Sequence, residues 1–409
     1  MTDTSAAPRG RFLERTSPPH IITLVLLAGL SALSMNIFLP SLPSMAVYFE
    51  TEPWLVAMAV PVYLAVNAVL QLGIGPISDR YGRRPVLLGS LIIFLIATLG
   101  TLWAPTIEWF LGFRMVQAVI VAGLVLSRAV VRDMVPAEQA ASMIGYVTMG
   151  MAFVPMIGPM IGGALDEVFG WQANFWLLLL IGLAVLWLVW RDLGETAGNR
   201  SASFRAQFAE YPELLAAPRF WGYCAAAAFA SGAFFAYLGG APFVATEYFD
   251  LSPALMGAYF GFPALGYAAG NYVSGRYSVR MGINTMILIG AGLTFGGLVL
   301  QTSLFLLGIA HPALFFGLFI FVGLGNGMVL PNANAGMLSV RPHLAGTASG
   351  LGGAMMIGGG AALSALAGTI LTEGSGPLPL LTLMLITSAL SLVAVAAVLR
   401  RERFLRMQG

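Results

Sequence analysis

One polar stretch, residues 75–85, reads Gly75-Pro76-Ile77-Ser78-Asp79-Arg80-Tyr81-Gly82-Arg83-Arg84-Pro85. It separates two apolar windows, 54–75 and 86–104, each with the length of about 20 residues that a membrane-spanning helix needs. Pro76 and the glycines predict a tight turn, and the arginines favour the anionic inner face of a membrane. The stretch therefore predicts a transmembrane helical hairpin whose turn lies on the inner side.

Ten further apolar windows accompany this pair. The twelve windows cover 21–41, 54–75, 86–104, 107–131, 140–165, 171–190, 220–243, 253–274, 284–308, 312–332, 346–370 and 378–399. With the N-terminus inside, nineteen of the 20 arginines fall on the inner side, in agreement with the positive-inside rule. We expect an all-α membrane protein with twelve transmembrane helices and both termini in the cytoplasm.

The composition excludes several other classes of protein. Of the 409 residues, 58% are hydrophobic and only 9% are charged, whereas soluble domains carry about 25% charged residues. All basic residues are arginines, which removes P-loop nucleotide hydrolysis and lysine Schiff bases, and a net charge of +2 leaves no basic surface for nucleic acid. Cys224 is the only cysteine, and His20, His311 and His343 lie far apart beside predicted helix ends. We expect no enzyme activity, no metal and no cofactor.

The hairpin stretch is echoed later in the chain. Four of its residues recur at an offset of 200, as Gly275, Ser278, Arg280 and Gly282. The repeat predicts two pseudo-symmetric six-helix halves, 1–190 and 220–409, joined by a cytoplasmic linker over 191–219. Residues 203–217 of the linker are compatible with an amphipathic helix on the membrane surface and equally with a mobile connection.

The pattern Gly75-x-x-x-Asp79-Arg80-x-Gly82-Arg83-Arg84 resembles the signature that the major facilitator superfamily carries between its second and third helices. The resemblance implies a cytoplasmic latch that holds the halves together in the outward-open state and breaks during the transport cycle. The latch residues would be Gly75, Asp79, Arg80, Gly82, Arg83, Arg84 and Asp133. The echo in the second half has Val279 in place of Asp79, so the latch would be one-sided.

Arg114 lies seven residues inside the predicted fourth helix, about 10 Å deep at a rise of 1.5 Å per residue. A charge at this depth marks a functional residue by default, unless its side chain snorkels to the outer interface. The spacing Leu111-x-x-Arg114-x-x-Gln117 resembles the superfamily's fourth-helix motif, whose arginine is linked to proton transfer, although Ala118 replaces the usual glycine. The candidates for proton coupling are Arg114, Asp79, Asp133 and Glu108, and Glu108 is also a candidate partner for Arg114.

The predicted fifth helix carries a stripe in which Gly150, Val154, Gly158 and Gly162 recur every four positions. Such a stripe permits close helix packing, and prolines within the helix should kink it. Together with the Gly158-Pro159 pair, the stripe resembles the motif that marks proton-driven antiporters within the superfamily. Its residues are Gly150, Pro155, Gly158, Pro159, Gly162 and Gly163, and they favour export.

Polar side chains on lipid-embedded helices should face the protein interior, where they find hydrogen-bond partners. Tyr63, Asn67 and Gln71 step by four along the second predicted helix and therefore share one face. The candidates for lining a substrate cavity are Asn36, Tyr63, Asn67, Gln71, Tyr237, Tyr259 and Asn326. For the aromatic members, simple packing is the alternative.

Strings at 37–40, 128–133, 241–244, 331–333 and 345–349 resemble the bicyclomycin/chloramphenicol-resistance branch of the drug/proton antiporters. That branch usually has an aspartate just before the first string, where this chain has Asn36. No carboxylate lies near the middle of a predicted span, and an amide cannot carry a proton. Proton coupling would then use Asp79, Asp133 or Glu108, or be altered.

The resemblance implies a secondary exporter of small organic molecules, drug-like or metabolite, in a bacterial inner membrane. It would act by proton antiport with alternating access, as a monomer whose partners are its small-molecule substrate, protons and the lipid bilayer. The alternative is an uptake symporter or facilitator of the same fold for a small metabolite. The Gly158-Pro159 pair favours export, whereas the missing acid in the first span leaves uptake open.

Overall fold

The computed structural model describes residues 13, 19–134, 147, 154, 157–197, 211–341, 344–372 and 374–408, and these residues form helices and loops without a β-strand. Ten helical segments among them are long and apolar enough to cross a membrane. Of the two remaining predicted spans, 140–165 lies mostly outside the described residues, although 157–169 is helical, and 253–274 is helical but more polar. The predicted all-helical membrane fold is confirmed, and twelve spans are consistent with it.

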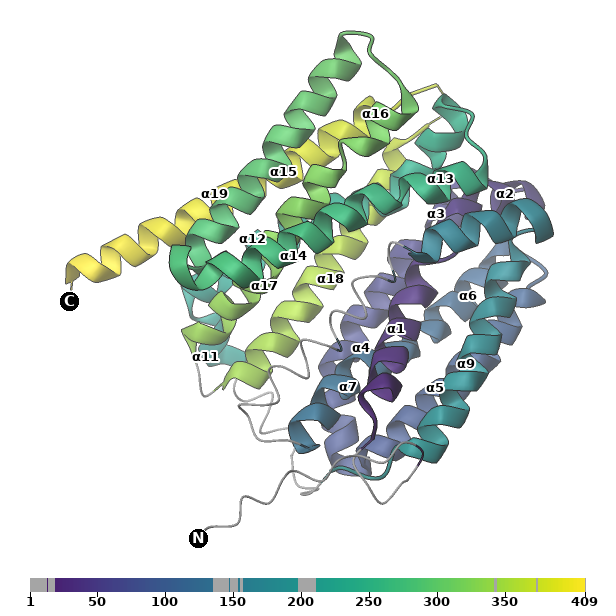
Figure 1. The fold of residues 1–409 in the computed structure, drawn as a ribbon, viewed down its shortest axis with the longest axis horizontal. Coiled ribbons are helices and arrows are strands. Elements are labelled where there is room, and N and C mark those ends of the chain that lie inside the picture. The colour runs from purple at the N-terminus through teal and green to yellow at the C-terminus, as the bar shows by residue number, and fades with distance from the viewer. Residues whose placement is uncertain are drawn as a thin grey trace.

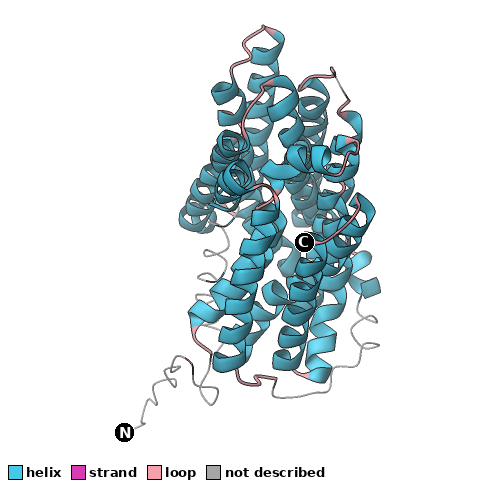
Figure 2. Ribbon diagram, turned by 90° about the vertical axis from the view of Figure 1, so that its right-hand side faces the viewer, coloured by secondary structure: helices cyan, strands magenta, loops and turns pink. Residues whose placement is uncertain are grey.

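The helices gather in two groups, which Figure 1 shows side by side. The N-terminal bundle comprises α1 (Ile21–Asn36), η1 (Leu39–Ser41), α2 (Leu42–Tyr48), α3 (Pro53–Ala57), α4 (Ala59–Tyr81), α5 (Arg83–Leu102), α6 (Ile107–Gln117), η2 (Ala118–Ile120), α7 (Val121–Met134), the helical residues 157–169 and α9 (Gln172–Asp192). The C-terminal bundle comprises α12 (Pro218–Phe243), η3 (Val244–Tyr248), α13 (Pro253–Tyr259), α14 (Gly261–Met281), α15 (Ile283–Leu306), α16 (Pro312–Gly317), α17 (Ile320–Val340), α18 (Ala345–Ile370) and α19 (Leu378–Gln408). Figure 2 shows the long helices running along the long dimension of the molecule.

Of the predicted linker 191–219, only part lies within the described residues. They include its first residues, where α9 ends, and a short helix, α11 (Tyr211–Leu215), directly before α12. Residues 198–210, which hold half of the possible amphipathic helix, lie outside them.

Several helices begin where the local chemistry favours a helix start. Pro53, Pro218, Pro253 and Pro312 open α3, α12, α13 and α16, at a position where a missing N–H costs nothing. His20 and His311 cap α1 and α16, because their Nδ1 atoms accept hydrogen bonds from the second following N–H at 3.3 and 3.2 Å. These two histidines therefore act as helix caps.

The sequence repeat at an offset of 200 corresponds to a repeated backbone conformation. Gly82 ends α4 with φ 101° and ψ 150°, and Gly282 ends α14 with φ 84° and ψ 150°. Each donates its N–H to the serine carbonyl four residues earlier, Ser78 or Ser278, at 2.9 Å. Because only glycine adopts this positive φ readily, both glycines are required by the turn. We call this end of the bundles the hairpin end.

The tight turn expected over the whole stretch 75–85 is wrong in its extent. Helix α4 continues through Pro76 to Tyr81, and the chain turns only at Gly82. Pro76 removes one intrahelical hydrogen bond, which the long helix tolerates, whereas the positive φ of Gly82 is incompatible with further helix.

Helices α4 and α18 join the two bundles along one continuous register. A Cβ placed on Gly368 would lie 3.3 Å from the Cβ of Ala57, just before α4, and one on Gly358 would lie 3.7 Å from the Cβ of Ala68. The same register pairs Gly75 with Gly350, yet around both of these glycines there is open space within 4 Å. A Cβ on Gly353 would lie 3.1 Å from the Gln71 side-chain oxygen, so contact with α18 extends from the opposite end to Gln71 and is absent around Gly75 and Gly350, at the hairpin end.

Candidate functional site

Arg83 is the centre of a charged cluster at the hairpin end. Its Nη1 pairs with the Asp79 carboxylate at 2.5 Å, and its Nε donates to the Asp133 carboxylate at 3.1 Å. The Arg83 Nη1 also donates to the Ser78 hydroxyl. One arginine thus joins the end of α4 to the end of α7, and Asp133 pairs with an arginine of the 75–85 stretch.

The other arginines of the stretch have different positions. Arg84 donates from Nε to the Leu193 carbonyl at 2.8 Å and from Nη2 to the Trp190 carbonyl at 3.2 Å, so it holds the end of α9. Arg80 is exposed, and its guanidinium lies 5.5 Å from the centre of the Tyr81 ring. Within the described residues, Arg80 therefore forms no ion pair with the acids of the cluster.

Glu195, which the sequence analysis missed, belongs to this cluster. Its carboxylate accepts hydrogen bonds from the Arg83 N–H at 2.9 Å and from the N–H groups of Thr196 and Ala197 at 3.0 Å. Thr196 in turn donates to Asp133 at 3.3 Å. A lone acid three residues after α9 carries no distinctive spacing, so only the folded structure identifies it.

Asp192 is a second acid that the sequence analysis missed. It is fully buried at the end of α9, and its carboxylate accepts hydrogen bonds from the Leu13 N–H and the His20 N–H at 2.8 Å each and from the Thr23 hydroxyl at 2.5 Å. Three donors satisfy this carboxylate and fix the chain that leads into α1.

Arg114 on α6 is fully buried, which excludes snorkelling to the interface. Its guanidinium lies between two aromatic rings, 4.4 Å from the centre of Phe38 and 4.5 Å from that of Tyr63. Nη1 donates to the Gln117 side-chain oxygen at 2.8 Å and to the Ser34 carbonyl at 3.2 Å. Nε and Nη2 have no hydrogen-bond partner.

Within the described residues, no carboxylate forms an ion pair with Arg114. Glu108, its expected partner, is exposed at the start of α6, and its carboxylate accepts a hydrogen bond from the Thr106 hydroxyl instead. The expected pairing is wrong because the two side chains point to different surroundings. An unpaired charge in a membrane-spanning helix costs about 2.5–3.5 kcal/mol on insertion scales, part of which the two aromatic rings offset.

The four predicted cavity residues of the N-terminal bundle are buried or half-buried. Tyr63 contacts Arg114, and Gln71 donates to the Asn67 side-chain oxygen at 2.7 Å. Asn36 is 1% exposed; its amide donates to the Ala32 carbonyl at 3.0 Å, and its oxygen has no partner.

The predicted cavity residues of the C-terminal bundle lie elsewhere, within an aromatic cluster. The Tyr237 ring lies 4.5 Å from Phe319 and 5.0 Å from Phe260, and the Tyr259 ring stacks on Phe316 at 5.3 Å. Asn326 is buried on α17 with its oxygen unpaired. Within the described residues, no hydrogen bond or ring contact joins the candidates of one bundle to those of the other.

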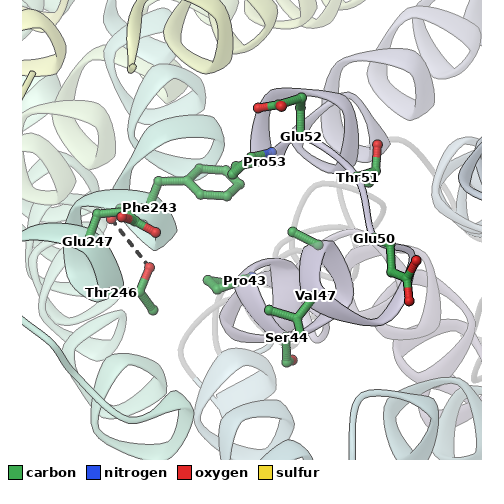
Figure 3. A pocket seen from close by; sticks show the side chains of 11 residues that line it. Pro43, Ser44, Val47, Glu50, Thr51, Glu52, Pro53, Phe243, Thr246 and Glu247 are labelled. Atoms are coloured by element: carbon green, nitrogen blue, oxygen red, sulfur yellow. Dashed lines mark hydrogen bonds between the residues drawn. The ribbon is translucent and has the colours of Figure 1, made fainter. Parts of the chain in front are cut away.

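A groove of about 730 Å³ lies between the bundles at the opposite end, as Figure 3 shows. Its walls come from the region around α2 and α3 on one side and from the end of α12 and η3 on the other. The lining residues are Pro43, Ser44, Ala46, Val47, Glu50, Thr51, Glu52, Pro53, Phe243, Thr246 and Glu247. None of the predicted cavity residues is among them.

Asp166 lies beside this groove. The Ser44 hydroxyl donates to its carboxylate at 2.7 Å. Burial raises the pKa of Asp166, and hydrogen bonds from Ser44 and Ser41 partly oppose this shift.

The antiporter motif is only partly described, because Gly150 and Pro155 lie outside the described residues. Gly158 and Gly162 both face α1: a Cβ on Gly158 would approach Leu33, and one on Gly162 would clash with the Ile37 carbonyl. Gly163 faces the other bundle, where a Cβ would clash with the Pro253 carbonyl. The predicted close packing therefore exists here, and it includes a contact between the bundles.

The family model described as Major Facilitator Superfamily matches residues 24–365. The chain is 29% identical to a chloramphenicol resistance protein of Pseudomonas aeruginosa, over 80% of this chain and 79% of that protein. It is 27% identical to a bicyclomycin resistance protein homolog of Haemophilus influenzae, over 88% of this chain and 91% of that protein. A solved bacterial homolog of the human lysosomal transporter Spinster, inward-facing and occupied, shares the fold with a TM-score of 0.71 at 16% identity, covering 94% of this chain and 96% of its own.

Proposed function

Because the chain belongs to the major facilitator superfamily, we propose that it is a secondary transporter that exports small organic molecules across the bacterial inner membrane. Relatives named for chloramphenicol and bicyclomycin resistance match it over most of its length, which supports a drug-like cargo. The protein would work as a monomer, with the units 1–190 and 220–409 rocking about the linker 191–219 and with both termini in the cytoplasm.

The structural observation that carries the proposal is the divergence of α4 from α18. The two helices contact each other at Ala57 and Gly368 and separate by Gly75 and Gly350. With the hairpin end in the cytoplasm, this state is closed outside and open inside. An exporter loads its cargo from this side, and rocking of the two bundles would then expose the cargo outside.

The charged cluster around Arg83 suits a latch for the other state. When α4 and α18 close along their shared register, Asp79 comes opposite the first turn of α18. The partial positive charge of a helix N-terminus attracts a carboxylate, so Asp79 would exchange part of its interaction with Arg83 for one across the bundles. The cluster would then help to hold the inner side closed.

Proton antiport is the coupling that we propose, with Asp79 and Asp133 as the groups that exchange protons. Both acids lie at the end of their helices and beside Arg83, not in the middle of the membrane. Glu108 is exposed at the far end of α6 and remains a third candidate. Because Asn36 stands where the branch usually has an acid, we expect this coupling to be loose and export to depend only weakly on the pH gradient. Strong dependence would mean that Asp79, Asp133 or Glu108 already carries the proton.

Reconstituted transport tests the proposal. The purified full-length chain is placed in proteoliposomes, and flux of chloramphenicol is followed with an imposed pH gradient of either sign and with none. We expect flux above that of protein-free vesicles, modestly increased by a gradient that drives protons against the cargo. Stimulation only by a gradient that carries protons along with the cargo would instead indicate a symporter.

A further inference from the structure

Arg114 offers an unused pair of hydrogen-bond donors. A guanidinium has five N–H donors in a fixed plane, and Nε and Nη2 point in the same direction along one edge. In this structure Nη1 is engaged by Gln117 and Ser34, whereas Nε and Nη2 have no partner. The free edge is the one that binds a carboxylate through two parallel hydrogen bonds.

The surroundings of this edge lack a negative charge. Within the described part of the chain, the acids of this bundle nearest in sequence, Glu108 and Asp133, are engaged by Thr106 and Arg83. The Nε and Nη2 donors of this fully buried cation therefore lie without an acceptor within the described residues.

We propose that Arg114 binds the carboxylate of an anionic substrate, so that the exported molecules are small aromatic or apolar monocarboxylates. This inference rests on the proposed export function and names its class of cargo. The Phe38 and Tyr63 rings lie 4.4 and 4.5 Å from the guanidinium carbon, so the free Nε and Nη2 donors have aromatic surroundings. A planar carboxylate fits such an edge, and the rings beside it suit an apolar body on the ligand.

The site is closed to solvent in this structure, since Arg114, Tyr63 and Phe38 are each 0% exposed. A ligand therefore enters only when one of the covering rings moves. We expect the Tyr63 side chain to move. Tyr63 lies on α4, and the polar residues Asn67 and Gln71 follow it on the same helix, in the direction of the open hairpin end.

Binding to the purified full-length protein tests the inference without requiring transport. Isothermal titration calorimetry compares benzoate with benzamide and 2-naphthoate with 2-naphthamide, pairs that differ only in the charged group. We expect the carboxylates to bind about 10- to 100-fold more tightly than the amides, the difference made by hydrogen bonds to a charged donor.

Three variants assign the difference to Arg114. Arg114→Met should bind acid and amide equally, and Arg114→Lys should keep a preference for the acid but bind it about tenfold more weakly, because an ammonium cannot form the paired bonds. Arg276→Met is the matched control, an exposed arginine that also lies beside a ring, Tyr277, and it should behave as wild type. If Arg114→Met does not fold, the weaker carboxylate binding expected of Arg114→Lys still tests whether Arg114 binds the carboxylate.

Equal binding of acids and amides by the wild-type protein would overturn the inference, as would an acid preference that survives in Arg114→Met. Chloramphenicol flux together with equal binding would leave the proposed export function standing and remove only the carboxylate site. Tight binding of the carboxylates without flux of any probe would support the carboxylate site and contradict the proposed export function.

Discussion

Arg83 and Arg114 are two arginines of the same bundle with opposite surroundings. Arg83 is shared by two carboxylates, whereas Arg114 has rings and carbonyls around it but no acid within the described residues. The depth of Arg114 could be predicted from the sequence, because it needs only the count of residues from a helix start. Its partners could not, since Phe38 follows α1 and Tyr63 lies on α4, and their contact with Arg114 depends on how the helices pack.

We expect Asp79→Asn to reduce transport about tenfold without changing membrane insertion. The amide keeps the shape of the side chain but removes the charge that pairs with Arg83 at 2.5 Å. Flux in proteoliposomes, normalised to inserted protein, measures the effect. Arg80→Gln is the control, because Arg80 is exposed and lies outside the cluster; equal losses in both variants would reduce the stretch to a topology signal.

We expect Asn36→Asp to steepen the dependence of export on the pH gradient. Asn36 is 1% exposed with an unpaired oxygen, so a carboxylate there would have a raised pKa and could be loaded and unloaded by protons. Flux is measured with the gradient present and collapsed, and Asn36→Ala serves as the control without an acid. Strong dependence in the unmodified protein would contradict this expectation.

Helix α4 illustrates, at the scale of single elements, what spacing predicts. Its apolar window and its membership of a hairpin follow from the sequence, and so does the repeat of Gly82 at Gly282. Its true end does not, because the cost of Pro76 inside the helix is smaller than the gain from continuing it to Tyr81. The divergence of α4 from α18 is a property of the packed state, and no local pattern encodes it.

Paired cysteines across α4 and α18 should report this divergence. A disulfide needs Cβ atoms about 3.5–4.5 Å apart, close to the 3.3 Å between Ala57 and a Cβ on Gly368. In a Cys224→Ala background, we expect Ala57→Cys with Gly368→Cys to cross-link readily and to block flux until it is reduced. The pair Gly75→Cys with Gly350→Cys should cross-link slowly; the opposite order would mean that the dominant state in the membrane is closed at the hairpin end.

For the whole molecule, the contact between the bundles depends on two glycines at the opposite end. A Cβ on Gly163 would clash with the Pro253 carbonyl, and one on Gly257 would clash with the Pro159 carbonyl. The glycine stripe predicted close packing of the helix over 157–169. It did not predict that Gly158 would face α1 while Gly163 faces the other bundle. The division into the units 1–190 and 220–409 stays a prediction, and it rests on the repeat of the hairpin.

We expect Gly257→Val to weaken the closed arrangement at the opposite end and to favour closure at the hairpin end. The added side chain would overlap backbone atoms of residues 159 and 160, which cannot move as a flexible side chain does. The readout is the cross-linking rate of the cysteine pair at positions 75 and 350, which should rise about fivefold. Gly261→Val is the control, with open space around Gly261; a similar rise there would point to general loosening.

The absence of an acid beside Arg114 has an electrical consequence. A transporter that neutralises this cation with its own carboxylate needs protons to release cargo, whereas one that neutralises it with the cargo's carboxylate moves a net negative charge outward in each cycle. The inside-negative voltage of a respiring cell favours that movement by about 2.3 kcal/mol per 100 mV, or about 50-fold in concentration. Export of an anion would then be electrogenic, and the cell's voltage would add to the driving force that the proposed proton antiport supplies.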